Sequence, residues 1–593
     1  MVGFRAAFGV LVAGFAATTV ATTSTPTSTA DSARCFPKDF LFGSATASYQ
    51  VEGAWNETGR TPSIWDDFCR AQPGLACANV ADDFLHRYRD DIQLMKDTNL
   101  DSFRFSISWS RVMNWDAKTQ TMKKNKPGIA FYHALIDELL RQKIVPILTL
   151  YHWDLPSELH TELSPQGWIN RQIIDHFVQY ADLMFNEFGS KVDLWTTFNE
   201  PHSFVEFGYG SGVHAPGYTG YEYVVGHHVL LSHAAVVQRF RELKKQGVIR
   251  KKARISIVLS ADHTYPLDPS NPLDVAAADR KSDFILGWFL LPIVTGHYPA
   301  TMRERIGNRL PEFTTEEAEL LKGSYDLFML NYYSSRVGTD CSTEHSTVPC
   351  GEGNSQWARD LGVDDNRLPD GSLLPTFGPD AGISYCKLFT PHPAGYLDTI
   401  KWMHAKDPKA DILLTENGHC GDETIEDAGQ LSYFQTHVEQ VHKAIYEFQI
   451  PIIGYTAWSF LDNYEWGSFS HRFGLYFVNF TEQTGSKDEC TPKPTDLARI
   501  PRTAAKWYSQ VAKTKCLDNI SITTSEAATV TLGAVAESHA TSTSSSAHFG
   551  FPAVGAGLVA AALVVAAIWR KTKLHGSRHA GATSEGTSLL VNN

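Results

Sequence analysis

A glutamate stands where a buried strand is expected to end. The apolar run 412–414 predicts a short strand covered on both faces, and Thr415 and Glu416 follow it directly. Asn417-Gly418 comes next, and both residues tolerate the backbone that a tight exit from a strand requires. In a parallel α/β barrel this end of a strand carries catalytic residues, so Glu416 is a candidate for chemistry.

A second glutamate occupies an equivalent place earlier in the chain. Glu200 follows the predicted strand Leu194–Phe198, and Pro201 prevents further strand pairing. Two carboxyl groups at strand ends of one barrel suit a reaction that needs a nucleophile and a proton donor. Cleavage of a glycosidic bond is the leading example of such a reaction.

An arginine is predicted to point toward these carboxyl groups. Arg104 alternates with apolar neighbours in the run Ser102–Trp109, which would direct its side chain into the barrel. A buried guanidinium needs an anion, and a carboxylate that it keeps ionised would be a suitable nucleophile. The alternative, that Arg104 neutralises a purely structural acid, remains open on these residues alone.

The elements that must position these groups alternate along the chain. Helical patterns such as Phe131–Gln142 and Ile173–Phe188 separate eight strand-like runs, which are Phe40–Ala45, Ser102–Trp109, Val145–Tyr151, Leu194–Phe198, Ala253–Leu259, Leu327–Asn331, Ile412–Thr415 and Ile452–Trp458. This alternation predicts an α/β fold, a single (β/α)8 barrel over residues 36–515. The Gly-, Pro- and Asp-rich stretch Asp340–Ser384 is expected to be a long loop beside the binding site.

Composition limits the partners of the chain. The 593 residues are 43% hydrophobic and 12% aromatic, and 52 basic residues face 65 acidic ones for a formal charge of −13. An acidic chain of this kind is poorly suited to nucleic acid or to an anionic surface as its main partner. Neutral ligands such as sugars are compatible with it.

Both ends of the chain carry apolar segments. Residues 1–21 match a secretory signal peptide, and a Thr/Ser-rich spacer follows at 22–35. Residues 516–548 predict a Ser/Thr-rich stalk, 549–569 an uncharged transmembrane helix, and 570–593 a cytoplasmic tail that begins with basic residues. The expectation is a single-pass type I membrane protein with its barrel outside the cell or in the lumen of the secretory pathway. A glycolipid-anchor signal or a core helix are the alternatives for 549–569.

The cysteines agree with an oxidising compartment. Cys69 and Cys77, and likewise Cys341 and Cys350, are close enough to close small loops. Nine cysteines are present, so at least one is free or bonded elsewhere. The acceptor patterns at Asn56, Asn479 and Asn519 are consistent with glycosylation. No metal-ligand spacing is found, and no cofactor is expected.

Several ordered motifs resemble glycoside hydrolase family 1, the β-glucosidase family. They cover residues 36–515 and are Phe42–Trp55, Pro62–Asp66, Tyr151–Pro156, Thr197-Phe-Asn-Glu-Pro201, His214–Gly217, Asn331–Tyr333, Thr415-Glu-Asn-Gly418, Trp458–Trp466 and Arg472–Gly474. Single tetrapeptides are weak signals, but the ordered set is specific.

The resemblance implies a retaining exo-β-glycosidase that acts on terminal β-D-glycosyl residues. It implies that Glu416 is the nucleophile, that Glu200 is the acid/base and that Arg104 and Tyr333 support the nucleophile, with the two carboxyl groups roughly 5 Å apart. Charge and burial would then separate the two pKa values, with Glu416 ionised and Glu200 protonated. The implied substrate-binding residues are Gln50, His152, Trp153, Asn199, Asn331, Trp458, Glu465 and Trp466.

Two positions depart from the usual family pattern, and two other functions are considered. His419 follows Glu-Asn-Gly where an apolar residue is more frequent, and His297 stands where Asp is frequent. A membrane-tethered glycosidase-like receptor without catalysis is the alternative function, but such proteins lack one or both glutamates. A thioglucosidase like the plant myrosinases is disfavoured because those enzymes replace the acid/base residue. The preferred sugar and the aglycone stay open.

Overall fold

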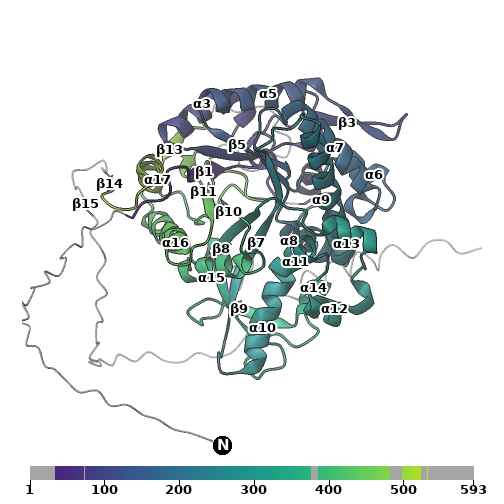
Figure 1. Cartoon of the computed structure of the whole chain (residues 1–593), viewed down its shortest axis with the longest axis vertical. Coiled ribbons are helices and arrows are strands. Elements are labelled where there is room, and N and C mark those ends of the chain that lie inside the picture. The colour runs from purple at the N-terminus through teal and green to yellow at the C-terminus, as the bar shows by residue number, and fades with distance from the viewer. Residues whose placement is uncertain (1–33, 73, 375–384, 481–496, 523–529, 532–593) are drawn as a thin grey trace, which may run out of the picture.

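Eight parallel strands close into a barrel (Figure 1). The computed structural model describes residues 34–72, 74–374, 385–480, 497–522 and 530–531. Within these ranges the barrel strands are β1 (Leu41–Ala45), β2 (Ser102–Ser106), β5 (Val145–Tyr151), β6 (Leu194–Asn199), β7 (Arg254–Pro266), β8 (Phe328–Asp340), β10 (Ile412–Glu416) and β11 (Ile452–Trp458). They pair in this order, and β11 returns to β1. The predicted (β/α)8 barrel is confirmed.

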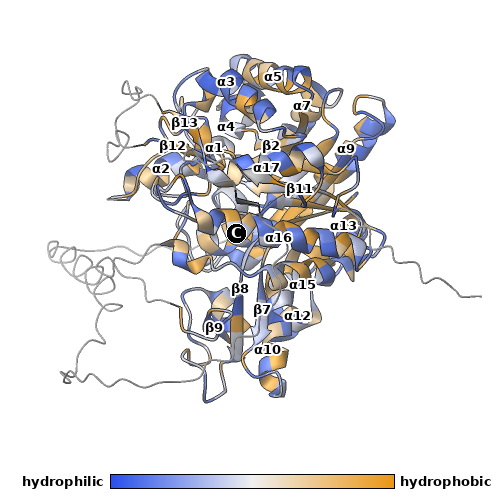
Figure 2. Ribbon diagram, turned by 90° about the vertical axis from the view of Figure 1, so that its left-hand side faces the viewer, coloured by the Kyte–Doolittle hydropathy of each residue, from blue (hydrophilic) through white to orange (hydrophobic). Residues whose placement is uncertain are grey.

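Helices surround the barrel (Figures 1 and 2). The longer ones are α3 (Phe84–Asp97), α5 (Lys126–Arg141), α7 (Ile173–Phe188), α9 (Glu222–Lys245), α10 (Pro272–Ser282), α15 (Pro393–His404), α16 (Ala428–Tyr446) and α17 (Thr503–Thr514). The shorter ones are α1 (Ser48–Val51), α2 (Ile64–Ala71), α4 (Trp109–Val112), α6 (Ser157–Glu162), α8 (Pro201–Val205), α11 (Trp288–Thr295), α12 (Ala300–Ile306), α13 (Thr315–Leu321) and α14 (Gln356–Leu361), together with η1 (Gly167–Ile169), η2 (Glu206–Gly210), η3 (Asp283–Gly287), η4 (Gly307–Arg309) and η5 (Tyr385–Leu388). Figure 2 shows both hydrophobic and hydrophilic residues along these helices, and in α5 and α7 the buried residues recur three or four positions apart, as in amphipathic helices.

Branched and long apolar side chains fill the inside of the barrel. Ile147, Leu194, Val258, Leu327, Met329 and Leu413 form one buried cluster contributed by neighbouring strands. Such layers make the interior of an α/β barrel a packed core rather than a channel. The polar residues at the carboxyl ends of the strands therefore stand on a rigid base.

Three predicted strands differ from the structure by more than one residue at an end. The predicted strand Ser102–Trp109 is too long, because β2 ends at Ser106 and Trp109 begins α4. The predictions for β7 and β8 are too short, since both strands continue to Pro266 and Asp340 and pair beyond the barrel rim. This extension carries β9 (Val363–Arg367), which pairs antiparallel with β8. The long loop predicted at Asp340–Ser384 thus contains α14 and β9.

Smaller antiparallel pairs and disulfides complete the described part of the chain. The pairs are β3 (Met113–Asp116) with β4 (Thr121–Lys124), β12 (Tyr476–Val478) with β13 (Arg499–Pro501), and β14 (Ser521–Ile522) with β15 (Val530–Thr531). The expected disulfides Cys69–Cys77 and Cys341–Cys350 are present, and Cys35–Cys516 and Cys386–Cys420 join them. The ninth cysteine, Cys490, lies outside the described residues.

The folded unit extends past the boundary predicted at residue 515. Leu517 and Ile520 pack against the core, and the Leu517 N–H donates a 2.9 Å hydrogen bond to the Arg34 carbonyl. The predicted stalk 516–548 is therefore wrong for its first residues. No helix within the described ranges is both long enough and apolar enough to span a bilayer. The predicted signal peptide and the segment 549–569 lie outside those ranges.

Candidate active site

The carboxyl end of β10 places Glu416 in the barrel mouth with a partner for each oxygen. Oε1 accepts a hydrogen bond from Arg104, and Oε2 accepts one of 2.6 Å from the Tyr333 hydroxyl. Only 3% of Glu416 is exposed. Burial raises the pKa of this carboxyl group, and the charge of Arg104 and the Tyr333 hydrogen bond oppose the rise.

Glu200 directly follows β6 and has a different environment. Its φ of +47° turns the chain from the strand into α8, for which Pro201 is a suitable first residue. Oε1 accepts a 2.6 Å hydrogen bond from Asn331 Nδ2, and Oε2 accepts one of 2.9 Å from the Ser203 hydroxyl. Burial and the negative charge of Glu416 raise the pKa of Glu200 to about 7. Glu200 therefore keeps its proton near neutral pH more readily than an exposed carboxyl group does.

A hydrogen-bond network joins the two carboxyl groups through the strand ends. Arg104 Nη2 donates to Asn199 Oδ1 over 2.7 Å, and Asn331 Nδ2 donates to the same oxygen over 3.1 Å. The Thr415 hydroxyl, next to Glu416, donates to Asn331 Oδ1 over 2.7 Å. Four strands, β2, β6, β8 and β10, thus fix the relative positions of Glu200 and Glu416.

The network also determines the tautomer of His152. Asn199 uses its oxygen as the acceptor described above, so its Nδ2 donates the 3.0 Å hydrogen bond to His152 Nε2. The imidazole is kept neutral, since burial and the charge of Arg104 lower its pKa well below the usual value. The proton of His152 is consequently on Nδ1, which is buried and has no partner among the described residues.

Gln50 has an unpaired acceptor that complements the unpaired donor of His152. Its Nε2 donates to Asn463 Oδ1, to the Tyr464 carbonyl and to Glu465 Oε2, over 3.0, 2.9 and 3.2 Å. Its Oε1 is buried and has no hydrogen-bond partner among the residues that the structure describes. A buried donor and a buried acceptor left unpaired are costly unless a ligand satisfies them, and a sugar hydroxyl can pair with either.

Indole rings line the same mouth. Trp466 stacks on Trp153 with ring centroids 4.2 Å apart and lies 4.8 Å from Trp65, and Trp458 lies 5.9 Å from the ring of His152. Trp153 donates its Nε1–H to the Asn199 carbonyl over 3.0 Å, so its contribution to a ligand is its ring face. Glu465 lies partly buried beside Gln50, and loss of hydration together with the charge of Glu416 raises its pKa to about 8.

All twelve residues predicted from the sequence lie at this end of the barrel, where Asn331 contacts Asn199, Glu200 and Thr415. Ser203 was missed, although its place three residues after Glu200 puts both on one face of α8. Thr415, Asn463 and Trp65 were also not predicted. Asn463 and Thr415 were inside the quoted motifs, but their contacts depend on distant strands. His419 and His297, the two departures from the family pattern, take no part in the network.

Comparison with known proteins agrees with this geometry. The sequence model described as Glycosyl hydrolase family 1 matches residues 32–517. Two relatives from Arabidopsis thaliana are Beta-glucosidase 26, peroxisomal, 36% identical over 82% of this chain and 86% of its own length, and Beta-glucosidase 32, 37% identical over 80% and 88%.

Solved structures are similar over nearly their whole length. A variant of the rice β-glucosidase Os3BGlu6 in a covalent complex with glucose is 33% identical, covers 80% of this chain and 98% of its own, and has a TM-score of 0.70. An aphid myrosinase is 32% identical with a TM-score of 0.71, covering 81% and 100%. The β-glucosidase from Trichoderma harzianum is 34% identical with a TM-score of 0.70, covering 82% and 98%.

Proposed function

Because the chain belongs to glycosyl hydrolase family 1 and is an O-glycosyl hydrolase of the β-glycosidase type, we propose that it is a retaining exo-β-glycosidase. Its substrate would be a terminal, non-reducing β-D-glycosyl residue of a small glycoside or oligosaccharide. The observation that carries the proposal is the unequal environment of the two carboxyl groups. Glu416 has a guanidinium and a phenol as partners, whereas Glu200 is buried with only neutral partners in contact.

The first chemical step consumes the charge of Glu416. Its carboxylate attacks the anomeric carbon, the bond from that carbon to the leaving oxygen breaks, and the proton of Glu200 passes to that oxygen. Arg104 and Tyr333 orient the attacking carboxylate. The product is a glycosyl ester of Glu416 and a free aglycone. The covalent glucose complex solved for the rice relative supports an intermediate of this kind.

The second step restores both groups. The ester no longer carries the negative charge that raised the pKa of Glu200, so this pKa falls. Glu200 therefore stays ionised after giving up its proton and can act as the general base. It takes a proton from water, the water oxygen bonds to the anomeric carbon, and the sugar leaves Glu416 as a carboxylate. Two displacements at one carbon return the original β configuration.

Two buried polar atoms without hydrogen-bond partners among the described residues support an exo mode of action on a single terminal sugar. His152 Nδ1–H can donate to a hydroxyl oxygen, and Gln50 Oε1 can accept from a hydroxyl proton. Glu465 adds a carboxyl group on the same side, and the indoles of Trp458 and Trp466 offer faces for C–H groups. Where Glu465 is ionised, above its pKa of about 8, its carboxylate would repel a phosphorylated sugar.

Chemical rescue tests the mechanism in the full-length protein. Glu416→Gly should abolish release of nitrophenol from p-nitrophenyl β-glucoside, and added azide should restore it with formation of the α-glycosyl azide. The inversion follows because azide replaces the enzyme nucleophile in a single displacement. Absence of activity of the wild-type protein on a panel of aryl β-glycosides, with binding of a protein ligand instead, would favour the receptor function.

We also propose a membrane tether that leaves the barrel on the side away from the active site. One support is the apolar run 549–569 in the sequence. The other is the disulfide between Cys516 and Cys35, because Cys35 lies five residues before Phe40 and thus shortly before β1 begins. The neighbouring Lys515 pairs with Asp101, which immediately precedes β2. Proteolysis of intact cells should release the barrel and leave a small tail fragment; release by a phospholipase would favour a lipid anchor.

A further inference from the structure

A second ligand-sized pocket lies on the outer helical layer. It has a volume of about 610 Å³ and is bounded by the turn between α11 and α12 on one side and by residues 312–322 on the other. None of the residues lining it belongs to the catalytic network. Its volume falls in the usual range for small-molecule sites, about 300–1,000 Å³.

Aromatic rings form the base of this pocket. Tyr298 and Phe313 stack with centroids 4.4 Å apart and planes 20° from parallel, and His227 stacks on Phe313 at 4.8 Å. Tyr298 is held by a 3.1 Å contact between its hydroxyl and His227 Nδ1. Phe313 is only half-buried, so part of its apolar surface stays accessible from the pocket.

Hydrogen bonds within the protein hold the walls of the pocket in place without a ligand. Arg303 lies over the ring of Tyr298 and donates to the carbonyl oxygens of Leu310 and Pro311 over 2.6 and 2.8 Å. Thr314 and Glu317 form a capping box at the start of α13. A preformed site binds with little loss of conformational entropy.

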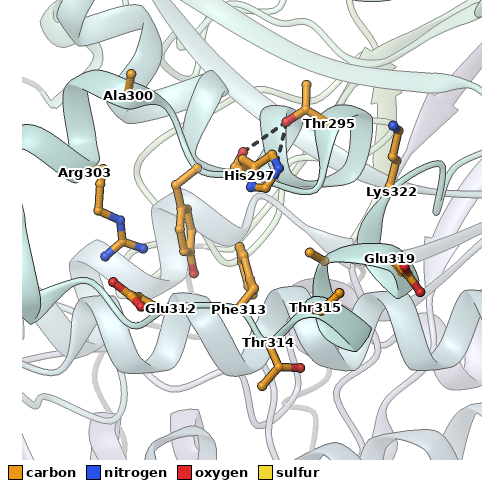
Figure 3. A pocket seen from close by; sticks show the side chains of 12 residues that line it. Thr295, His297, Ala300, Arg303, Glu312, Phe313, Thr314, Thr315, Glu319 and Lys322 are labelled. Carbon is orange, nitrogen blue, oxygen red and sulfur yellow. Dashed lines mark hydrogen bonds between the residues drawn. The ribbon is translucent and has the colours of Figure 1, made fainter.

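The charges around the pocket balance. Figure 3 shows Arg303 and Glu312 at one end, Lys322 and Glu319 at the other, and His297 with Phe313 between them. Two cations and two carboxylates leave no net charge to favour an ionic ligand. The hydroxyl of Thr315 adds a group that can both donate and accept, whereas that of Thr295 already bonds to Leu291 and His297.

The hollow continues along the surface of the protein. A second depression of about 290 Å³ between α9 and α13 shares Glu319 and Lys322 with the pocket. The second depression adds the charged residues Arg241, Glu242 and Lys245, and the accessible aromatic surface belongs to the pocket around Phe313. A chain of neutral sugar units fits this pattern, because pyranose C–H faces pack on aromatic rings and hydroxyls pair with mixed donors and acceptors.

We infer that the pocket around Phe313 is a non-catalytic binding site for a neutral oligosaccharide. It goes beyond the proposed catalytic function, since none of its residues takes part in that chemistry. Such a site would hold a glycan on the enzyme surface independently of the sugar in the barrel mouth. His297, which the catalytic site does not use, is part of it.

Binding stoichiometry tests the inference in the full-length protein carrying Glu416→Gln, which removes turnover. Cellotetraose, laminaritetraose and mannotetraose are titrated separately by calorimetry. At least one of them should occupy two sites per chain. Phe313→Ala in the same background should weaken one of the two sites about tenfold, the effect of losing roughly 1.4 kcal/mol of contact.

Exposed side chains supply variants that keep the fold. Glu319→Ala and Lys322→Ala should weaken the same site, whereas Glu316→Ala, exposed on α13 outside the pocket, should not. All three should leave hydrolysis of p-nitrophenyl β-glucoside unchanged.

The possible results separate the two proposals. A single site abolished by the pocket variants supports the oligosaccharide site and contradicts binding in the barrel mouth. A single site insensitive to those variants, two sites that are both insensitive to them, or no binding of any tetrasaccharide overturns the inference. A pocket that takes acidic tetragalacturonate in preference to the neutral probes also overturns it.

Discussion

The Tyr333 hydroxyl donates a 2.6 Å hydrogen bond to Oε2 of Glu416, the carboxylate oxygen that Arg104 does not contact. The phenol is partly buried, and its loss of hydration together with the charge of Glu416 raises its pKa well above the usual value. It therefore stays a donor throughout the accessible pH range. Each oxygen of the proposed nucleophile thus has its own donor, one charged and one neutral.

Replacing Tyr333 by phenylalanine removes the neutral donor and keeps the ring. We expect kcat/KM to fall about tenfold to hundredfold, because a hydrogen bond to a charged group contributes about 1.5–3 kcal/mol. The hydroxyl lowers the pKa of Glu416, so its loss should also move the acid limb of the pH profile upward. Tyr332→Phe is the matched control, since that hydroxyl bonds Ser335 and His392 instead. An acid limb that stays in place would contradict the assignment.

Ser203 is predicted to lower the pKa of the acid/base residue Glu200. Glu200 must be protonated to act as an acid, so kcat/KM should fall as the pH rises through about 7. The Ser203 hydroxyl donates to the carboxylate form and lowers the pKa of Glu200. Ser203→Ala should therefore shift the alkaline limb upward by about one unit.

The conservative variant separates this effect from a change in packing. Ser203→Thr keeps the hydroxyl and should retain the wild-type alkaline limb, whereas a general disturbance of α8 would alter both variants alike. The pH dependence of kcat/KM, measured with an aryl β-glucoside, is the decisive measurement. An identical limb in the wild-type, alanine and threonine proteins would exclude this role for Ser203.

The effect of removing Glu200 on the rate should depend on the leaving group of the substrate. Glu200→Ala should slow cleavage of a poorly activated alkyl β-glucoside by about 10²–10⁴-fold, because the departing oxygen then lacks a proton donor. A dinitrophenyl β-glucoside needs no such donor, so its first step should be nearly spared. Azide should accelerate turnover of this substrate and give the β-glycosyl azide. Equal losses for both substrates would argue that Glu200 only maintains the fold.

A buried aspartate predicts a pH dependence of stability. Asp82 is fully buried, neither carboxyl oxygen has a hydrogen-bond partner among the described residues, and burial raises its pKa well above the usual value. A group with a raised pKa in the folded state favours folding below its unfolded pKa, near 3.8, and this contribution is lost as pH rises toward the folded pKa.

The variant Asp82→Asn should remove that dependence. Its melting temperature relative to the wild type should increase from pH 5 to pH 8, because the amide does not ionise. Asp39→Asn, at an exposed position, serves as the control and should show no such trend. A difference in melting temperature that is constant over this range would show that Asp82 stays in one protonation state.

Much of the architecture could be predicted from local patterns. The apolar runs that became β5 and β11 have the predicted bounds, and the helix Ile173–Phe188 is reproduced as α7. Short-range periodicity defines such elements because each is covered by the core along its whole length. The ends of β7 and β8 could not be predicted in this way, since their outer halves are stabilised by pairing with each other beyond the barrel.

Local sequence patterns are sufficient to predict which residues stand at strand ends, and therefore that Glu200 and Glu416 share one rim of the barrel. The contacts between individual atoms follow only from the closed barrel. The disulfide between Cys35 and Cys516, the hydrogen bond from Asn331 to Glu200 and the one from Asn199 to His152 all join segments far apart in the chain. Local sequence carries no information on these contacts, because the closure of the barrel, not the neighbouring residues, brings their partners together.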